Sequence, residues 1–306
     1  MKTWLKILLT AAKSWQADNV FKHAASVSFY TLFSIAPITI IAVTVMGLFL
    51  GRERATAQLN QQVVQLIGPA SAELVQKAAE ASRTEKESTF ATITGVVLLL
   101  FGATTVFAQL QESLNQIWDV RAKPRKHAWL VLVVRRLLSF AMVLTMGFLL
   151  LVSLVLSTWV TSALGYFQSS VLASPALLKA ADLGIGSGVI AVLFALLFKV
   201  LPDVQLRWRD VIIGAVVTSV LFTIGRYLIA LYLAHSTVAS VYGTAGSLVA
   251  LLIWVYYSCA ILFFGAELTR AYRAAHRLKV IPKENAVLVR EEVVRPRTRA
   301  AAITGD

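Results

Sequence analysis

The sequence has a single cysteine and few charged residues. Cys259 lies within an apolar stretch, so the chain can form neither an internal disulfide nor a zinc site built on cysteines. Only 15% of the 306 residues are charged, whereas 58% are apolar. This balance is far from that of a soluble globular domain, so most of the chain must face lipid or pack inside a membrane bundle.

Enzyme and cofactor motifs are also lacking. The four histidines are scattered along the chain, and none has metal-ligand spacing to another histidine, a cysteine or an acid. We find no phosphate-binding loop, dinucleotide fingerprint or serine-nucleophile elbow. The sequence therefore predicts no catalytic residue, no metal and no cofactor, and the chain is expected not to be an enzyme.

Six nearly uncharged stretches are present, each close to the roughly 20 residues that a helix needs to cross a bilayer. They predict an all-α fold, a polytopic membrane bundle of six transmembrane helices. The fourth stretch is the shortest. The stretches cover residues 24–50, 90–110, 137–160, 183–201, 211–233 and 245–266.

Lys and Arg residues set the predicted orientation of this bundle. They are frequent before the first stretch, between the second and third, between the fourth and fifth, and after the sixth. The opposite segments are poor in them: residues 161–182 carry only Lys179, and residues 234–244 carry none. Both termini are therefore expected in the cytoplasm. Because the net charge of +13 follows this pattern, it is not attributed to nucleic-acid binding.

The chain divides into three predicted regions. Residues 1–22 carry apolar side chains at helical spacing and predict an amphipathic helix on the inner membrane surface; the alternative, a cleaved signal peptide, is opposed by Lys6. Residues 23–270 form the transmembrane domain, with a helical segment at 51–89 that either caps the outer face or rests on the lipid headgroups. Residues 271–306 are predicted to be a basic, largely disordered cytoplasmic tail.

Arg226 is the clearest anomaly, because it lies inside the fifth stretch. An arginine within a span marks a candidate functional site. At 1.5 Å per residue it lies about 22 Å along the helix from Val211, in the outer third of the bilayer. It either attracts an anionic headgroup or solute, or it has a structural role in which it snorkels outward or pairs with Asp182.

Two further charged residues lie at the ends of spans that are nearest to the inner membrane surface. Glu267 ends the sixth stretch and Lys199 ends the fourth. A structural role is favoured for Glu267, as a carboxylate that bonds Arg270, a loop backbone or Lys199, and a substrate or proton role is the alternative. The spans contain no further acidic residue, which argues against a carrier built on buried carboxylates.

Neutral polar residues in the first stretch allow two interpretations. Hydroxyl groups commonly bond between membrane helices, so packing is favoured. The sharper interpretation has Ser34 and Thr39 flanking a helix break at Pro37 and lining a polar path. Gly184 and Gly188 match the small-residue spacing of close helix pairs. The complete candidate substrate path is Arg226, Tyr30, Ser34, Pro37, Asp182, Lys199 and Glu267.

Three segments together resemble the YihY/BrkB family of bacterial inner-membrane proteins, some of which carry the label ribonuclease BN. They are Asp18-Asn19 with residues 24–37 (AASVSFYTLFSIAP), residues 201–215 (LPDVQLRWRDVIIGA) and residues 242–269 (YGTAGSLVALLIWVYYSCAILFFGAELT). The resemblance implies a six-helix inner-membrane protein, from a family suspected of transporting lipids or solutes. It ties these positions to the family pattern: Asp18, Asn19, Tyr30, Pro37, Pro202, Asp203, Arg209, Asp210, Tyr242, Gly243, Gly246 and Glu267.

Three functions follow as hypotheses. The preferred one is an inner-membrane transport protein for a lipid or other amphipathic anion, with membrane lipids as partners and a homo-oligomer as a plausible state. The second is a non-catalytic scaffold or regulatory protein of the envelope. The least supported is a membrane-associated ribonuclease, for which Asp203 and Asp210 are the only compact acidic pair; Arg207 and Arg209 beside them favour a salt-bridged turn instead.

Overall fold

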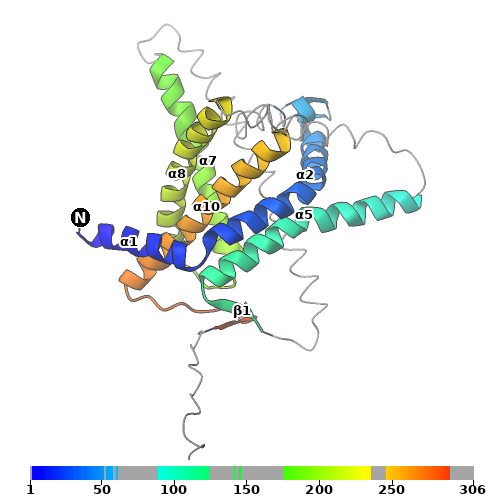
Figure 1. The fold of residues 1–306 in the computed structure, drawn as a ribbon. Coiled ribbons are helices and arrows are strands. Elements are labelled where there is room, and N and C mark those ends of the chain that lie inside the picture. Colours follow the sequence, from blue (N-terminus) through cyan, green and yellow to red (C-terminus); the bar gives the residue numbers. More distant parts are fainter. Residues whose placement is uncertain are drawn as a thin grey trace, which may run out of the picture.

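The computed structural model describes residues 2–51, 53–57, 60, 89–123, 141, 145, 175–235 and 246–289. Within these ranges the chain is mostly helical, as predicted (Figure 1). The third predicted stretch and most of the 51–89 segment lie outside the described residues. The elements are α1 (Lys2–Ala17), α2 (Val20–Leu50), α5 (Thr89–Ile117), β1 (Val120–Ala122), α7 (Pro175–Val200), α8 (Trp208–His235), α10 (Gly246–Ala275) and β2 (Ala286–Leu288).

Helices α2, α5, α7, α8 and α10 correspond to the first, second, fourth, fifth and sixth predicted stretches. Among the described residues, two segments are long and apolar enough to cross a membrane, Trp208–Ile229 and Leu248–Ala275, and Gly186–Val200 is a shorter apolar helix. The count of six spans and their orientation remain predictions.

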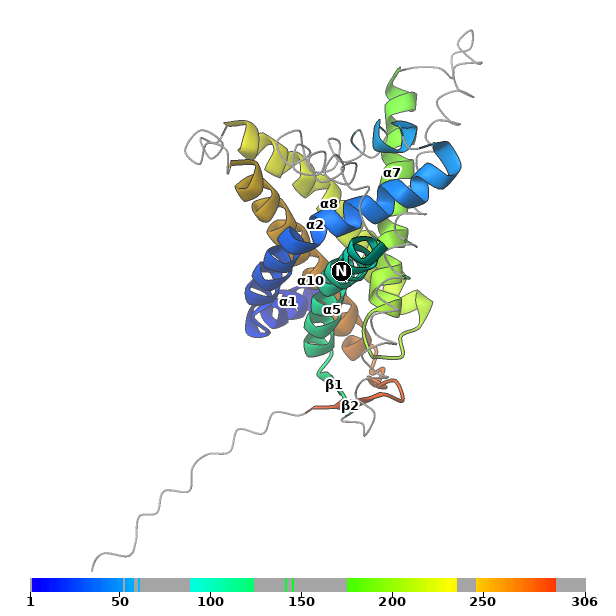
Figure 2. The same cartoon turned by 90° about the vertical axis from the view of Figure 1, so that its right-hand side faces the viewer.

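Helix α10 lies at the centre of the described fold and contacts α1, α2, α5 and α8. The helices come together at one end and diverge toward the other (Figures 1 and 2). We call the converging end the base; it also carries α1 and the two-stranded β1–β2 sheet. Large buried side chains from α5, α7, α10 and the loop after α7 fill the core, among them Leu114, Ile117, Phe198, Leu201 and Phe263.

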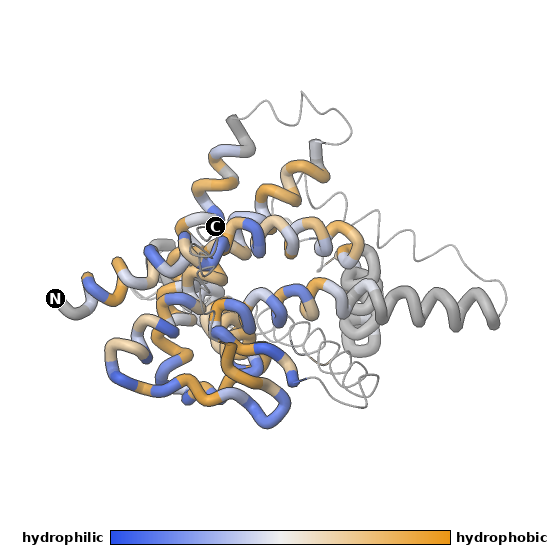
Figure 3. Tube along the Cα trace, turned by 60° about the horizontal axis from the view of Figure 1, so that its bottom comes forward, coloured by the Kyte–Doolittle hydropathy of each residue, from blue (hydrophilic) through white to orange (hydrophobic). Residues whose placement is uncertain are grey.

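The N-terminal helix α1 packs along α10. Its Ile7 and Ala11 are buried against Leu268 and Ala271, and Trp15 Nε1 donates a hydrogen bond to the Ala260 carbonyl at 3.0 Å. Hydrophilic and hydrophobic residues alternate along this helix (Figure 3). Its remaining apolar residues stay exposed, as a helix resting on a lipid surface requires; they are Trp4, Leu5, Leu8 and Leu9.

Helices α8 and α10 approach closely through two matching Gly-x-x-x-Thr segments. A Cβ placed on Gly214 would overlap the Thr269 hydroxyl, and one placed on Gly265 would overlap the Thr218 hydroxyl. Each threonine hydroxyl donates to the carbonyl of the glycine four residues earlier in its own helix, at 2.6 Å for Thr218 and 2.8 Å for Thr269. Small residues of this kind let membrane helices pack closely.

The glycines singled out from the sequence do not have this role. A Cβ on Gly184 or Gly188 would meet no atom within 4 Å. Their spacing alone could not show which helix face meets a neighbour.

The segment after residue 271 differs from the disordered tail predicted for 271–306. Helix α10 continues to Ala275, and residues up to 289 fold back across the base, where β2 pairs antiparallel with β1. Backbone bonds extend this pairing, from Lys123 N to Asn285 O at 2.9 Å and from Val289 N to Asp119 O at 2.8 Å. The prediction was wrong for this part, because β1 supplies bonding partners that the tail sequence itself does not reveal. Residues 290–306 lie outside the described residues.

Candidate functional site

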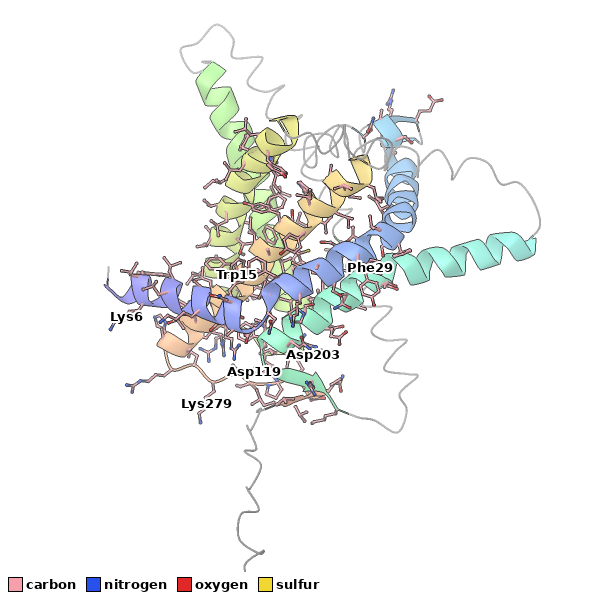
Figure 4. All side chains as sticks on the ribbon, viewed as in Figure 1. Lys6, Trp15, Phe29, Asp119, Asp203 and Lys279 are labelled. Atoms are coloured by element: carbon pink, nitrogen blue, oxygen red, sulfur yellow. The ribbon has the colours of Figure 1, made fainter. Side chains whose placement is uncertain are left out.

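The candidate site lies at the base, where charged side chains from different elements meet. Figure 4 places Asp119 and Asp203 there, well away from Phe29 of α2. The polar contacts form three groups, centred on Arg270, on Arg273 and on Asp203. Each group joins segments that are far apart in the sequence.

Arg270 of α10 joins two turns of the chain. It donates to Asp18, between α1 and α2, at 3.0 Å, and to Asp119, directly after α5. Asn19 and Asp119 both have a left-handed backbone, with φ of 51° and 52°, a conformation that Asn and Asp tolerate better than most residues. The two turns thereby bring carboxylates to one guanidinium.

Arg273, one turn further along α10, forms a buried ion pair with Asp210 in the first turn of α8. Their side chains are only 6% and 7% exposed. Arg273 also donates to the Lys279 carbonyl at 2.7 Å. This pair ties the start of α8 to the end of α10 and to the segment that follows it.

Asp203, in the loop between α7 and α8, is held by amide side chains of α5. Asn115 Nδ2 donates to Asp203 Oδ2 at 2.8 Å, and Asn115 Oδ1 accepts from the Asp203 backbone N–H at 2.7 Å. Gln111 Nε2 donates to Asp203 Oδ1 at 3.3 Å. Lys283 completes the junction, because its backbone N–H donates to the Asp203 carbonyl and its Nζ donates to the Val200 carbonyl. Burial lowers the pKa of Lys283, although the charge of Asp203 acts in the opposite direction.

The predicted salt-bridged turn in this loop is wrong. Within the described part of the chain, Asp210 pairs with Arg273 and not with Arg207 or Arg209, which are exposed. Asp203 and Asp210 are bound by different helices, so the pair considered for RNA hydrolysis is not assembled. Short-range spacing could not predict this, because both partners come from distant segments.

Glu267 is fully buried, and among the described residues neither of its carboxylate oxygens has a hydrogen-bond partner. The predicted bond to Lys199 or Arg270 is therefore wrong. Lys199 instead donates to the Leu206 carbonyl and lies 5.8 Å from the centre of the Trp208 ring. Arg270 is directed to the two aspartates described above.

A pocket of about 670 Å³ lies beside the Arg270 group. Its lining comes from the turn between α1 and α2, the end of α5, and β1. Polar side chains line it, including positively and negatively charged ones: Asp18, Asn19, Lys22, His23, Asp119 and Arg121. The base therefore offers a polar space next to the buried Glu267.

Arg226 lies far from this base, on α8. Its guanidinium lies 5.1 Å from the centre of the Tyr227 ring, and its Nη2 is 3.4 Å from the Tyr227 hydroxyl. No carboxylate pairs with it among the described side chains. The Asp182 side chain lies outside them, so the predicted pairing stays untested.

The other predicted path residues do not gather around Arg226. Ser34 is buried in α2 and donates to the Gly102 carbonyl of α5, which supports the packing interpretation. Tyr30 contacts the Phe29 ring. Helix α2 runs unbroken through residue 37, so the predicted break at Pro37 is wrong. Of the family-pattern residues, Gly246 begins α10 and is buried, whereas Tyr242 and Gly243 lie outside the described residues.

Sequence reasoning missed Asp119, Asn115 and Arg273. A usable signal was present for two of these three residues, Arg273 and Asn115. Glu267, Arg270 and Arg273 are spaced by three residues at the end of an apolar helix, and such spacing places side chains on one face. Gln111 and Asn115 are four residues apart on α5 and share a face in the same way.

Asn115→Ala is expected to lower the free energy of unfolding by about 2 kcal/mol, because it removes both Asn115 bonds to Asp203 and leaves those groups short of partners. Titration with SDS in mixed micelles measures the change. The matched control is Gln116→Ala at the adjacent exposed position. Equal effects of the two substitutions would contradict the role given to Asn115.

The sequence model of the family described as virulence factor BrkB matches residues 11–287. A UPF0761 membrane protein of Halorhodospira halophila is 30% identical over 260 residues, which cover 84% of this chain and 55% of the relative. Its counterpart in Methylibium petroleiphilum is 27% identical, with 92% and 65% covered, and that in Alteromonas mediterranea is 26% identical, with 89% and 92% covered. The chain thus spans less than two thirds of the length of the first two. No solved structure matches.

Proposed function

Since this chain belongs to the BrkB family of membrane proteins, we propose that it is a bacterial inner-membrane transport protein that moves a lipid or another amphipathic anion. The relatives' names state a membrane protein and no activity. The proposal includes six spans with both termini in the cytoplasm, which places the base on the cytoplasmic side.

The observation that supports this function is the position of Arg226 beside an exposed apolar surface of α8. Tyr227, whose ring Arg226 overlies, is 59% exposed. Apolar side chains follow along the helix at steps of about one turn. This α8 stripe consists of Trp208, Ile212, Val216, Val220, Ile224, Tyr227, Leu228 and Tyr232, all exposed.

A cation beside such a stripe suits a molecule with an anionic head and apolar tails. Guanidinium groups bind phosphate and carboxylate oxygens in a bidentate manner. The tails of the same molecule remain in the bilayer along the α8 stripe, where they need no polar partner. Placing an isolated arginine in a lipid-facing position is unfavourable, and an anionic headgroup offsets that cost.

Arg226→Gln is expected to reduce the movement of a labelled anionic phospholipid across proteoliposome membranes by about tenfold, which corresponds to about 1.4 kcal/mol of lost interaction. The rate is measured by the accessibility of the label to a quencher added outside. Arg226→Lys, which keeps the charge, serves as the matched control and is expected to retain a measurable rate.

Equal rates for wild-type protein and Arg226→Gln would contradict the role of Arg226. No movement above protein-free liposomes, for anionic and zwitterionic lipids alike, would reject lipid transport and favour the scaffold hypothesis. Cleavage of RNA by the purified protein, lost in Asp203→Ala, would be needed to revive the ribonuclease hypothesis.

A further inference from the structure

Two buried carboxyl groups at the base have opposite surroundings. Asp210 is buried and paired with Arg273. Glu267, on the same helix as Arg273, is buried more completely, and within the part of the chain that the structure describes neither of its oxygens has a hydrogen-bond partner. An ionised carboxylate buried without a partner is strongly unfavourable, so a group in this position either binds a cation or holds a proton.

Asp18, which is paired with Arg270 one turn further along the same helix, offers a side chain of suitable chemistry. Its carboxyl group lies within hydrogen-bonding reach of Glu267, provided that one of the two carries a proton. Ionised carboxylates are only acceptors, which is why Glu267 has no partner when both are charged. A single proton between them replaces a repulsion by a hydrogen bond, as in other carboxyl pairs that share a site.

The charged groups around Glu267 favour a proton over a metal ion. Asp18 comes from the turn between α1 and α2, Asp119 follows α5, and Arg270 lies on α10 itself. From α8, Asp210 is already bound to Arg273. The described residues contain no cluster of three or more ligands for a metal. Three carboxyl groups facing one guanidinium leave an excess of negative charge that a proton reduces.

We infer that Asp18 and Glu267 form a proton-binding pair at the base, which exchanges its proton with the adjoining pocket. Asp18 is the route of exchange, because it lines the pocket and its side chain is 32% exposed, whereas Glu267 is closed off from solvent. The inference does not depend on lipid transport. The proposed protonation site is separate from Arg226.

Infrared spectroscopy of the purified protein tests this directly, because a protonated carboxyl group has a carbonyl stretch that an ionised one lacks. At pH 7 the wild-type spectrum minus that of Glu267→Gln is expected to contain this band, and deuterium exchange is expected to shift it. Glu267→Gln is expected to keep its thermal stability, since glutamine has nearly the shape of a protonated glutamate. Glu284→Gln, which changes an exposed carboxyl group outside this group of charges, serves as the matched control and is expected to retain the band.

Asp18→Asn distinguishes an Asp18–Glu267 pair from a Glu267 side chain that is protonated on its own. The asparagine amide donates to Glu267 without any proton from solvent, so the band is expected to be lost or reduced at least severalfold at pH 7. An unchanged band in Asp18→Asn would overturn the pairing. A wild-type spectrum without a band that Glu267→Gln removes would overturn the whole inference. Neither outcome bears on the lipid-transport assay of Arg226, so the two proposals fail separately.

Discussion

Asp210→Ala is expected to lower the free energy of unfolding by about 3–5 kcal/mol, the usual effect of removing one partner of a buried ion pair. The substitution leaves the Arg273 guanidinium buried with the Lys279 carbonyl as its remaining acceptor. The Arg273 Nε has no hydrogen-bond partner among the described residues even in the unsubstituted protein. SDS titration in mixed micelles measures the loss, followed by tryptophan fluorescence.

The control for Asp210 is Asp119→Ala, which removes a more exposed partner of Arg270. With side chains 52% and 27% exposed, that pair is expected to contribute less than about 1 kcal/mol. The double variant Asp210→Leu with Arg273→Met is expected to recover most of the stability, because two apolar side chains leave no buried charge. If the double variant were less stable than Asp210→Ala, unpaired charge would not be the cause.

Gly265→Val is expected to lower the free energy of unfolding by about 3 kcal/mol, at the upper end of the usual effect of overfilling a packed interior. Its side chain would overlap the Thr218 hydroxyl and contact the Phe198 ring. Helices α8 and α10 would have to separate, and the loss of this contact would extend to the reciprocal one between Gly214 and Thr269. The same SDS titration measures this change in the free energy of unfolding.

The control for Gly265 is Gly184→Ala, where the added methyl group meets no atom within 4 Å. That substitution is expected to be neutral or to stabilise by about 0.5–1 kcal/mol, because alanine is the better helix former. Combining Gly265→Ala with Thr218→Gly is expected to recover part of the loss caused by Gly265→Ala alone. Additive effects in this double-mutant cycle would show that the two residues do not meet.

The helices of this chain are predictable because a long apolar run has few alternatives in a membrane. Where these helices end and which residues they contact cannot be predicted in the same way. Helix α10 continues past residue 266 because Arg270 and Arg273 find carboxylates on α8 and in the turns after α1 and α5. Those partners are separated from them by 63 to 252 residues. The periodicity of a short segment cannot predict pairings between residues so far apart in the sequence.

The candidate site was predictable only in part for the same reason. Glu267 and Arg226 stand out in the sequence, since each is a charge at or within a span. The neighbouring residues that give Glu267 and Arg226 different roles cannot be identified from the sequence. The sequence favours Arg270 or a loop backbone as the partner of Glu267, with Lys199 as a further candidate, but Lys199 bonds the loop that follows it. Only the folded chain shows that Glu267 is buried among Asp18, Asp119 and Arg270, which come from three different segments.

The pairing of β1 with β2 has a consequence for synthesis. Strand β1, at residues 120–122, leaves the ribosome long before β2, at residues 286–288. Until β2 arrives, β1 presents unpaired backbone groups of the kind that other extended chains bind. The nascent protein therefore passes through a long interval in which its base is open, and a chain interrupted before residue 286 would carry this exposed edge as a mark that proteases and chaperones can recognise.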